Sequence, residues 1–406
     1  MSPEPFRVAI AQDAIDDLRA RLRRTRFPRD FANEQSTYGM QRAYIEPFLN
    51  TWLQADWRET EAAINAFANY GVVLDGVPIH FIHERGKGPN PMPLILTHGW
   101  PWSFWDFREA IRPLTDPAAF GGDERDAFDV IVPSLPGFGF SSPLEVDQVS
   151  AWKTVPLWDR LMREVLGYKR YAAAGGDFGA MITMQLGQHF PDVVRGVYLT
   201  MASAPRAARP PETPPPTTLR QLLGLIDGPT SRLKREDFGP EEQHWFDNLE
   251  TRWVDALAHV AVHTTDPQGI AFALHDSPAG LASWLVERRR RWSDNDGNVE
   301  QALSRQFLID LVSIYWYTET FFTTARWYWH TFRSGPAPVA DPERARTVPV
   351  GIAVSPKDLV YTPRRIIEAN ANLVHWTEHP RGGHFGPAEE PELFIGDVRA
   401  FFRRLR

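Results

Sequence analysis

The chain has 406 residues, of which 43% are hydrophobic and 23% charged, and its formal net charge is −7. This composition is typical of a globular protein with a large core and excludes a disordered chain. The acidic balance offers no basic surface for nucleic acid, and the absence of cysteine excludes disulfides and thiolate metal sites. The arginine-rich stretches Arg19–Arg29 and Arg288–Arg291 lie beside acidic residues, so we expect solvated helix faces there.

The N-terminal residues lack the basic and apolar pattern of a secretory signal, and no apolar stretch approaches the ~18 residues of a membrane span. We therefore expect a cytoplasmic protein with no membrane span. The 15 Trp and 25 Phe residues favour a large apolar cavity or a lid.

The N-terminal part of the chain is predicted to be helical. Ile15, Leu18 and Leu22 recur at helical spacing, and a second helical run is expected at 57–70. The residues 72–83 then predict two strands joined by a tight turn.

After this hairpin, short apolar strands alternate with helices, which predicts a mostly parallel α/β sheet. Ligands of such sheets bind outside the carboxyl ends of the strands. The predicted strands are Leu94–Thr97, Asp129–Pro133, Arg170–Gly175, Val194–Thr200, Val348–Val354 and Asn372–Thr377.

The alternation is interrupted between the fourth and fifth of these strands. A proline-rich stretch at 205–216 leaves the sheet, and a helical region rich in tryptophan follows. We interpret this region as a helical cap over the strand ends. The expected division is a helical arm at 1–70, an α/β core at 71–203 and 346–406, and the inserted cap at 204–345.

A glycine-rich turn, Gly175-Gly176-Asp177-Phe178-Gly179, follows one predicted strand and precedes a predicted helix over Met181–His189. This is the pattern of a nucleophile elbow, where small residues permit a tight turn and a strained nucleophile. The nucleophile position holds Asp177, and no G-x-S-x-G sequence occurs in the chain. A carboxylate in this place attacks a saturated carbon and forms an alkyl ester.

Two further polar residues follow later predicted strands. His384 has the usual position of a catalytic base, and Asp358 is placed to orient that histidine. The order Asp177, Asp358, His384 matches the nucleophile, acid and base order of an α/β-hydrolase. We therefore predict that these three residues are catalytic, with His384 activating the water that hydrolyses the ester.

The backbone N–H groups of Trp100, in the sequence His98-Gly-Trp-Pro101, and of Phe178 are expected to form an oxyanion hole. An aspartate nucleophile suits epoxides, whose oxygen needs a proton donor, and alkyl halides, which need N–H donors. The Phe178 side chain has no N–H for a halide, which favours the epoxide.

These motifs resemble those of the microsomal-type epoxide hydrolases, over nearly the whole chain. The resemblance implies an α/β-hydrolase fold with a helical N-terminal arm and an inserted helical cap. It also implies hydrolysis of an apolar or aromatic small-molecule epoxide to a vicinal diol, no metal or organic cofactor, and a homodimer. The aromatic cap favours a bulky apolar epoxide. The matching segments are Phe27-Pro28, His98–Ser103, Leu135–Ser141, Gly175–Gly179, Leu274–Leu281, Ser355–Asp358 and Gly382–Phe385.

The resemblance further implies two cap tyrosines that point at the epoxide oxygen. One corresponds to Tyr328. Counting back without gaps from Leu274–Leu281 through Pro267, the place of the other is held by His259. We predict that His259 partners Tyr328, because an imidazole can donate from a ring nitrogen in either charge state.

Two alternatives stay open at this point. The chain could be a haloalkane dehalogenase that uses the same Asp177 ester, which halide release would identify. It could also be an α/β-hydrolase without activity that serves in binding, although a binding module has no need of Asp177, Asp358 and His384 together.

Overall fold

The computed structural model describes residues 2–147, 149–205, 233–256 and 258–406, without the side chains of 252–257. A nine-stranded sheet runs through these residues in the order β1-β2-β3-β5-β4-β6-β7-β8-β9. Its strands are β1 Glu4–Pro5, β2 Asn69–Leu74, β3 Val77–Glu84, β4 Met92–Thr97, β5 Phe128–Pro133, β6 Tyr171–Gly175, β7 Val194–Leu199, β8 Pro349–Val354 and β9 Asn372–Glu378.

The strands from β4 onward are parallel to their neighbours, whereas β1, β2 and β3 form an antiparallel extension that joins the rest at β5. Every predicted strand is present, with ends that shift by one to three residues. The central strands β5 and β6 are buried along their whole length, as expected for parallel strands covered on both faces. The carboxyl ends of β4, β6 and β8 therefore meet at one edge.

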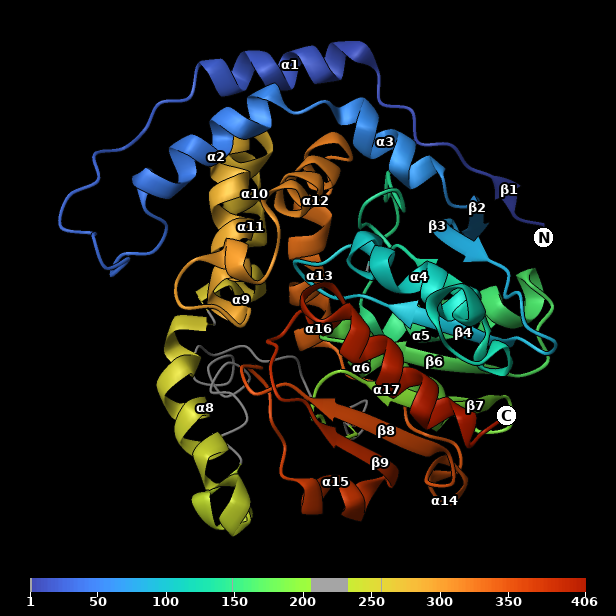
Figure 1. Ribbon diagram of the computed structural model, residues 1–406. Coiled ribbons are helices and arrows are strands. Elements are labelled where there is room, and N and C mark those ends of the chain that lie inside the picture. The colour runs from blue at the N-terminus through green and yellow to red at the C-terminus, as the bar shows by residue number, and fades with distance from the viewer. Residues whose placement is uncertain (1, 148, 206–232, 257) are drawn as a thin grey trace.

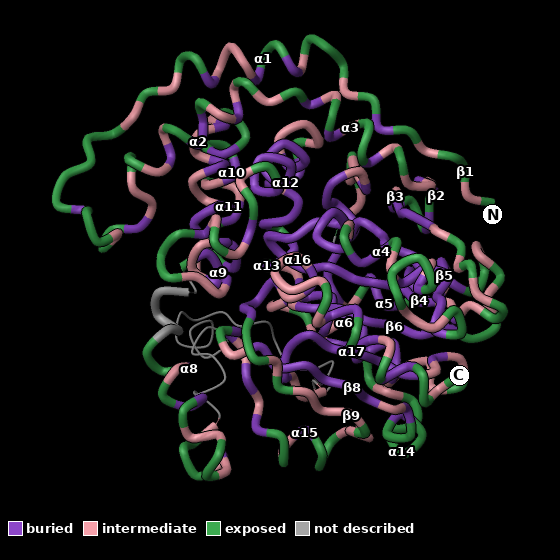
Figure 2. Tube along the Cα trace, viewed as in Figure 1, coloured by how far each residue is buried: buried purple, intermediate pink, exposed green. Residues whose placement is uncertain are grey.

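Helices cover both faces of the sheet. The helices α4 (Arg108–Thr115) and α17 (Pro391–Arg403) pack together in front of it in Figure 1, and α5 (Ala151–Arg160) and α6 (Phe178–His189) pack together behind it. The shorter helices α14 (Pro342–Ala345), α15 (Arg364–Asn370) and α16 (Gly386–Glu389) complete the core. Figure 2 shows burial concentrated in the sheet and the helices next to it.

The N-terminal arm consists of α1 (Gln12–Arg23), α2 (Arg42–Gln54) and α3 (Trp57–Asn65). The apolar side chains predicted at helical spacing in α1 are its buried face. The helical run expected to reach residue 70 was wrong at its end, because Asn69 belongs to β2. The Asn69 side chain donates a hydrogen bond to the carbonyl of Ile64 at 2.8 Å, and this bond satisfies a carbonyl in the last turn of α3.

Between β7 and β8, the described residues form six helices besides α14, and some of these pack against the arm in the upper part of Figure 1. The six are α8 (Gln243–Ala256), α9 (Ala258–Thr265), α10 (Pro267–Asp276), α11 (Pro278–Trp292), α12 (Arg305–Tyr317) and α13 (Phe321–Arg333). The prolines expected to leave the sheet at 210–216 lie outside the described residues. Within the described ranges, no helix has the length and apolarity to cross a membrane.

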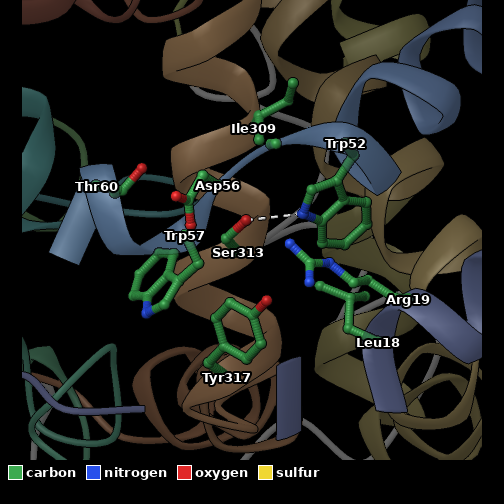
Figure 3. Close-up of a pocket in the computed structure, with 10 residues that line it drawn as sticks. Leu18, Arg19, Trp52, Asp56, Trp57, Thr60, Ile309, Ser313 and Tyr317 are labelled. Atoms are coloured by element: carbon green, nitrogen blue, oxygen red, sulfur yellow. Dashed lines mark hydrogen bonds between the residues drawn. The ribbon is translucent and has the colours of Figure 1, made fainter. Parts of the chain in front are cut away.

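The arm, the inserted helices and the core are joined by buried polar contacts. Trp52 of α2 donates to the hydroxyl of Ser313 in α12 at 2.8 Å, beside a small pocket that the arm and α12 line (Figure 3). Arg289 of α11 forms a fully buried ion pair with Asp106 at 2.6 Å and donates to the carbonyl of Pro101 at 2.8 Å. These contacts fix α11 and α12 relative to the sheet edge.

The stretch Arg288–Arg291 is not the solvated face that we expected. Arg288 is 6% exposed and Arg289 is fully buried, whereas Arg290 and Arg291 are partly exposed and pair with Glu287. The expectation was wrong because two of the four arginines point inward: Arg288 lies over the ring of Trp284, and Arg289 lies over the ring of Phe385 and pairs with Asp106.

Candidate active site

Asp177 stands at the sharp turn between β6 and α6. Its backbone has φ 54° and ψ −125°, a conformation that a non-glycine residue adopts only under strain. The turn is tight enough that a Cβ atom on Gly179 would lie 1.9 Å from the carbonyl oxygen of Thr97. The helix begins at Phe178, directly after Asp177, and not at the predicted Met181. The turn therefore holds the Asp177 carboxylate out above the sheet edge.

The loop after β4 lies over this carboxylate. The Trp100 N–H donates to Oδ1 of Asp177 at 2.9 Å, and a Cβ on Gly99 would lie only 2.2 Å from that oxygen. His98 holds the loop, since its Nδ1 contacts the Gly99 carbonyl and its Nε2 accepts from the Leu135 N–H at 3.0 Å. Burial lowers the pKa of His98 to about 4, so the ring is neutral and can accept this bond.

His384 lies between two carboxylates. Its Nε2 is 3.1 Å from Oδ2 of Asp177, and its Nδ1 is 2.8 Å from Oδ1 of Asp358. His384 and Asp358 are each 3% exposed. The structure thus brings together the three residues that the sequence predicted, although they come from the ends of three different strands.

Opposing effects set the pKa of His384. Burial alone would lower it, but the charge of Asp358 and the hydrogen bonds to Asp177 and Asp358 raise it to about 10. His384 is therefore an imidazolium at neutral pH.

Glu389 holds the His384 loop from behind. Its carboxylate accepts the backbone N–H groups of Gly383 and Phe385, on either side of His384, at 3.0 and 2.7 Å, and that of Asp294 at 2.7 Å. Burial raises the pKa of Glu389 to about 7, against the effect of these three bonds. The position was visible in the sequence only as an acidic residue after the histidine, and its partners are backbone groups that no motif displays.

Tyr328 of α13 and His259 of α9 meet on the cap side of Asp177. The hydroxyl of Tyr328 is 3.1 Å from Nε2 of His259, and both residues are buried. The His259 ring stacks on Trp100 with centroids 4.8 Å apart, and the Tyr328 ring meets Phe178 edge-on at 4.8 Å. Burial and the nearby charge of Asp177 hold the pKa of Tyr328 well above 10, so its hydroxyl keeps its proton.

Phe178, the second residue predicted for the oxyanion hole, is the first residue of α6. The first N–H groups of a helix have no intrahelical acceptor, so the Phe178 N–H has none within α6. Its part in an oxyanion hole with Trp100 stays a prediction.

The sheet order, the strained aspartate after β6 and the histidine after β9 define the chain as an α/β-hydrolase whose nucleophile position is an aspartate. A family model described as "Epoxide hydrolase N terminus" matches residues 3–107, and one described as "alpha/beta hydrolase fold" matches residues 92–251. The chain belongs to the epoxide hydrolase family.

The chain is similar to relatives and to a solved structure over nearly its full length. A protein of Stigmatella aurantiaca that carries an epoxide hydrolase designation is 37% identical over 99% of this chain and 85% of its own length. Epoxide hydrolase 1 of Oryctolagus cuniculus is 31% identical over 98% of this chain and 88% of its own. The structure of Aspergillus niger epoxide hydrolase superposes with a TM-score of 0.80 at 28% identity, covering 100% of this chain and 97% of that one. The resemblance and the fold class that the sequence predicted are confirmed.

Proposed function

We propose that this protein hydrolyses an epoxide to a vicinal diol through a covalent ester on Asp177. The observation that carries the proposal is the Asp177 carboxylate itself, which has one oxygen on the Trp100 N–H and the other facing His384. In the first step, Oδ2 forms a bond to an epoxide carbon and the ring C–O bond breaks. The electron pair goes to the epoxide oxygen, which takes a proton from the Tyr328 hydroxyl.

In the second step, His384 takes a proton from water, and the water oxygen attacks the carbonyl carbon of the ester. Negative charge develops on Oδ1, where the N–H groups of Trp100 and Phe178 stabilise it. When the tetrahedral intermediate collapses, the leaving diol oxygen takes the proton from the His384 imidazolium. The Asp177 carboxyl group then gives its proton to His384, so that Asp177 is a carboxylate again. Asp358 stabilises the imidazolium form of His384 throughout.

The first step prepares His384 for the second. Beside an ionised Asp177 its pKa is about 10, so it is protonated and cannot act as a base. Esterification removes the negative charge of Asp177 and the hydrogen bond to it, both of which raise this pKa. The pKa of His384 therefore falls once the ester has formed. The imidazolium proton passes through water to the Tyr328 oxygen, which lost its proton in the first step, and the neutral ring can then accept a proton from the attacking water.

We propose that His259 acts on the epoxide through Tyr328. If Nε2 of His259 carries a proton and donates to the Tyr328 oxygen, the tyrosine proton is free for the epoxide oxygen. Single-turnover alkylation in wild type, His259→Gln and His259→Tyr tests this pairing. His259→Gln should slow alkylation and His259→Tyr should restore part of it. An identical rate in all three would mean that His259 only lines the site.

The substrate that we propose is an apolar or aromatic epoxide, because the rings of Trp100, Phe178 and Trp292 surround the site. The cytoplasmic location, the homodimer and the domain boundaries stay predictions.

The test of the proposal is isotopic labelling in a single turnover. In oxygen-18 water, excess enzyme with styrene oxide should place label in Asp177 and none in the first diol released. His384→Gln should trap the ester for mass spectrometry, and His275→Gln, an exposed histidine of α10, is the matched control. Label in the first diol would mean direct attack by water and would overturn the covalent mechanism. Halide release from alkyl halides, without diol formation from epoxides, would assign the protein to dehalogenation.

A further inference from the structure

Arg288 carries a buried charge that forms no ion pair with any described residue. It is 6% exposed, and its Nε and Nη1 have no hydrogen-bond partner. The neighbouring carboxylate of Glu287 is occupied by Arg290 and Arg291 at 2.8 and 2.7 Å. Arg289, by contrast, pairs with Asp106. A buried cation without an acceptor destabilises the folded protein, and a ligand that supplied the acceptor would explain why an arginine stands there.

The position of Arg288 on α11 puts it next to the active site. Trp284, Arg288 and Trp292 follow one another at intervals of four residues and share one face of the helix. Trp292, at one end of this row, has its ring 5.5 Å from that of His384. Arg288 lies over the ring of Trp284, 5.5 Å from its centroid. The guanidinium is therefore about one helical turn, ~5–6 Å along the axis, from the residue that touches the histidine.

His263 lies opposite this row and is also without a partner. It is fully buried, and neither ring nitrogen has a hydrogen bond. Its ring is 6.0 Å from that of Trp284 and 5.1 Å from that of Tyr328. Burial, reinforced by the charge of Arg288, lowers the pKa of His263 to about 3, so the ring is neutral and offers one N–H donor.

Arg288 and His263 lie near each other between α11 and α9. The charge of Arg288 acts on the pKa of His263 and also on that of Tyr328. The row on α11 faces the row of His259 and His263 on α9, since Trp292 contacts His259 at 4.8 Å. One end of this interface holds the epoxide-activating pair, and the other holds an unpaired cation and an unpaired imidazole.

We propose that Arg288 and His263 form a subsite for a carboxylate on the substrate, so that the preferred substrate is an epoxide that carries a carboxylate beyond an apolar spacer. This inference rests on the proposed function and names its substrate class. A carboxylate supplies what both groups lack, because its oxygens accept hydrogen bonds and its charge neutralises the buried guanidinium. The spacer lies along the aromatic rings between the subsite and Asp177.

Ligand binding tests the subsite without catalysis. Isothermal titration of the full-length protein with 4-phenylbutyrate, and with 4-phenylbutyramide as the neutral match, should show the carboxylate binding ~10–100-fold more tightly, the range expected for a hydrogen-bonded charge pair. Arg288→Met should abolish this preference and Arg288→Lys should keep part of it. Arg291→Met, a surface arginine of the same helix, should leave the preference intact.

Catalysis supplies the second arm. For 4-(oxiran-2-yl)benzoate against its primary amide, the ratio of kcat/KM should fall ~10–100-fold in Arg288→Met, mainly through KM. Loss of an unpaired buried charge should also leave the denaturation midpoint of Arg288→Met at or above that of wild type. If wild type hydrolyses styrene oxide but neither assay distinguishes the carboxylate from the amide, the subsite is wrong and the proposed function stands. If no epoxide is hydrolysed while the carboxylate still binds through Arg288, the proposed function fails and the anion site stands.

Discussion

Replacing Asp358 with asparagine tests the electrostatic part of the proposed mechanism. Oδ1 of Asp358 accepts from Nδ1 of His384 at 2.8 Å and from the backbone N–H groups of Leu359 and Val360 at 2.5 and 3.3 Å. Because three N–H groups donate to Oδ1 of Asp358, we expect the asparagine side chain to place its amide oxygen, which can accept them, at the Oδ1 position. The amide nitrogen then occupies the Oδ2 position, which has no partner among the described residues. His384 keeps its tautomer, and only the charge of Asp358 is lost.

The magnitude follows from that geometry. A hydrogen bond to a charged group contributes ~1.5–3 kcal/mol, and each 1.36 kcal/mol is tenfold in rate, so ester hydrolysis should slow ~10–150-fold. A change of tautomer would cost ~10⁴-fold, as in the serine protease triad. Ester formation should slow much less, because His384 accepts no proton in that step.

Rapid mixing separates the two steps. Tryptophan fluorescence in a single turnover gives both rates, and quenched mass spectrometry should show the ester on Asp177 accumulating in Asp358→Asn. Asp75→Asn, in an exposed turn where asparagine is tolerated, is the matched control. Equal slowing of both steps, or no slowing of hydrolysis, would refute the role given to Asp358.

Three further outcomes are expected. Tyr328→Phe should slow alkylation by ~10²-fold or more, because it removes the general acid. Tyr315→Phe is the control and should leave alkylation unchanged, because the Tyr315 hydroxyl donates to the Trp102 carbonyl at 2.9 Å. Alkylation rates from single turnovers measure both effects. Arg289→Met should lower the free energy of unfolding by ~3–5 kcal/mol, because it leaves Asp106 a buried carboxylate without its cation; urea denaturation measures the loss, and adding Asp106→Leu should recover part of it. Glu389 has its pKa raised from 4.5 to about 7, so its contribution to stability is present below pH 4.5 and lost as the pH rises through 7. Glu389→Gln, which does not titrate, should remove this part of the pH dependence of the free energy of unfolding.

The sequence could indicate that Asp177, Asp358 and His384 lie together because each follows its own strand within a short motif. The elbow needs glycine at Gly179 whatever the rest of the chain does, since a larger residue meets the backbone of β4. The count back from Pro267 pointed to His259, which lies beside Tyr328 in the structure; its role stays a prediction. Such signals are local, and local sequence is enough to place them.

The residues that the sequence did not indicate depend on distant partners. Arg289 and Asp106 are 183 positions apart, and the sequence motifs around each residue give no sign that the two will pair. Arg288 was expected in solvent because periodicity cannot tell which helix face another part of the chain covers. His263 carries no motif, and its unpaired state exists only in the folded protein.

Asp310 of α12 has a consequence for how ligands enter and leave. It is 7% exposed and accepts from Thr60 of the arm at 2.8 Å, from Trp105 of the core at 3.2 Å and from Gln306 of its own helix at 2.8 Å. One carboxylate thus joins three parts of the chain. A rigid hinge motion that lifted α12 from the sheet would break the contacts to Thr60 and Trp105 together, each worth ~1.5–3 kcal/mol. Substrate exchange should therefore proceed through local fluctuations around the site, on a faster timescale than opening of the whole cap.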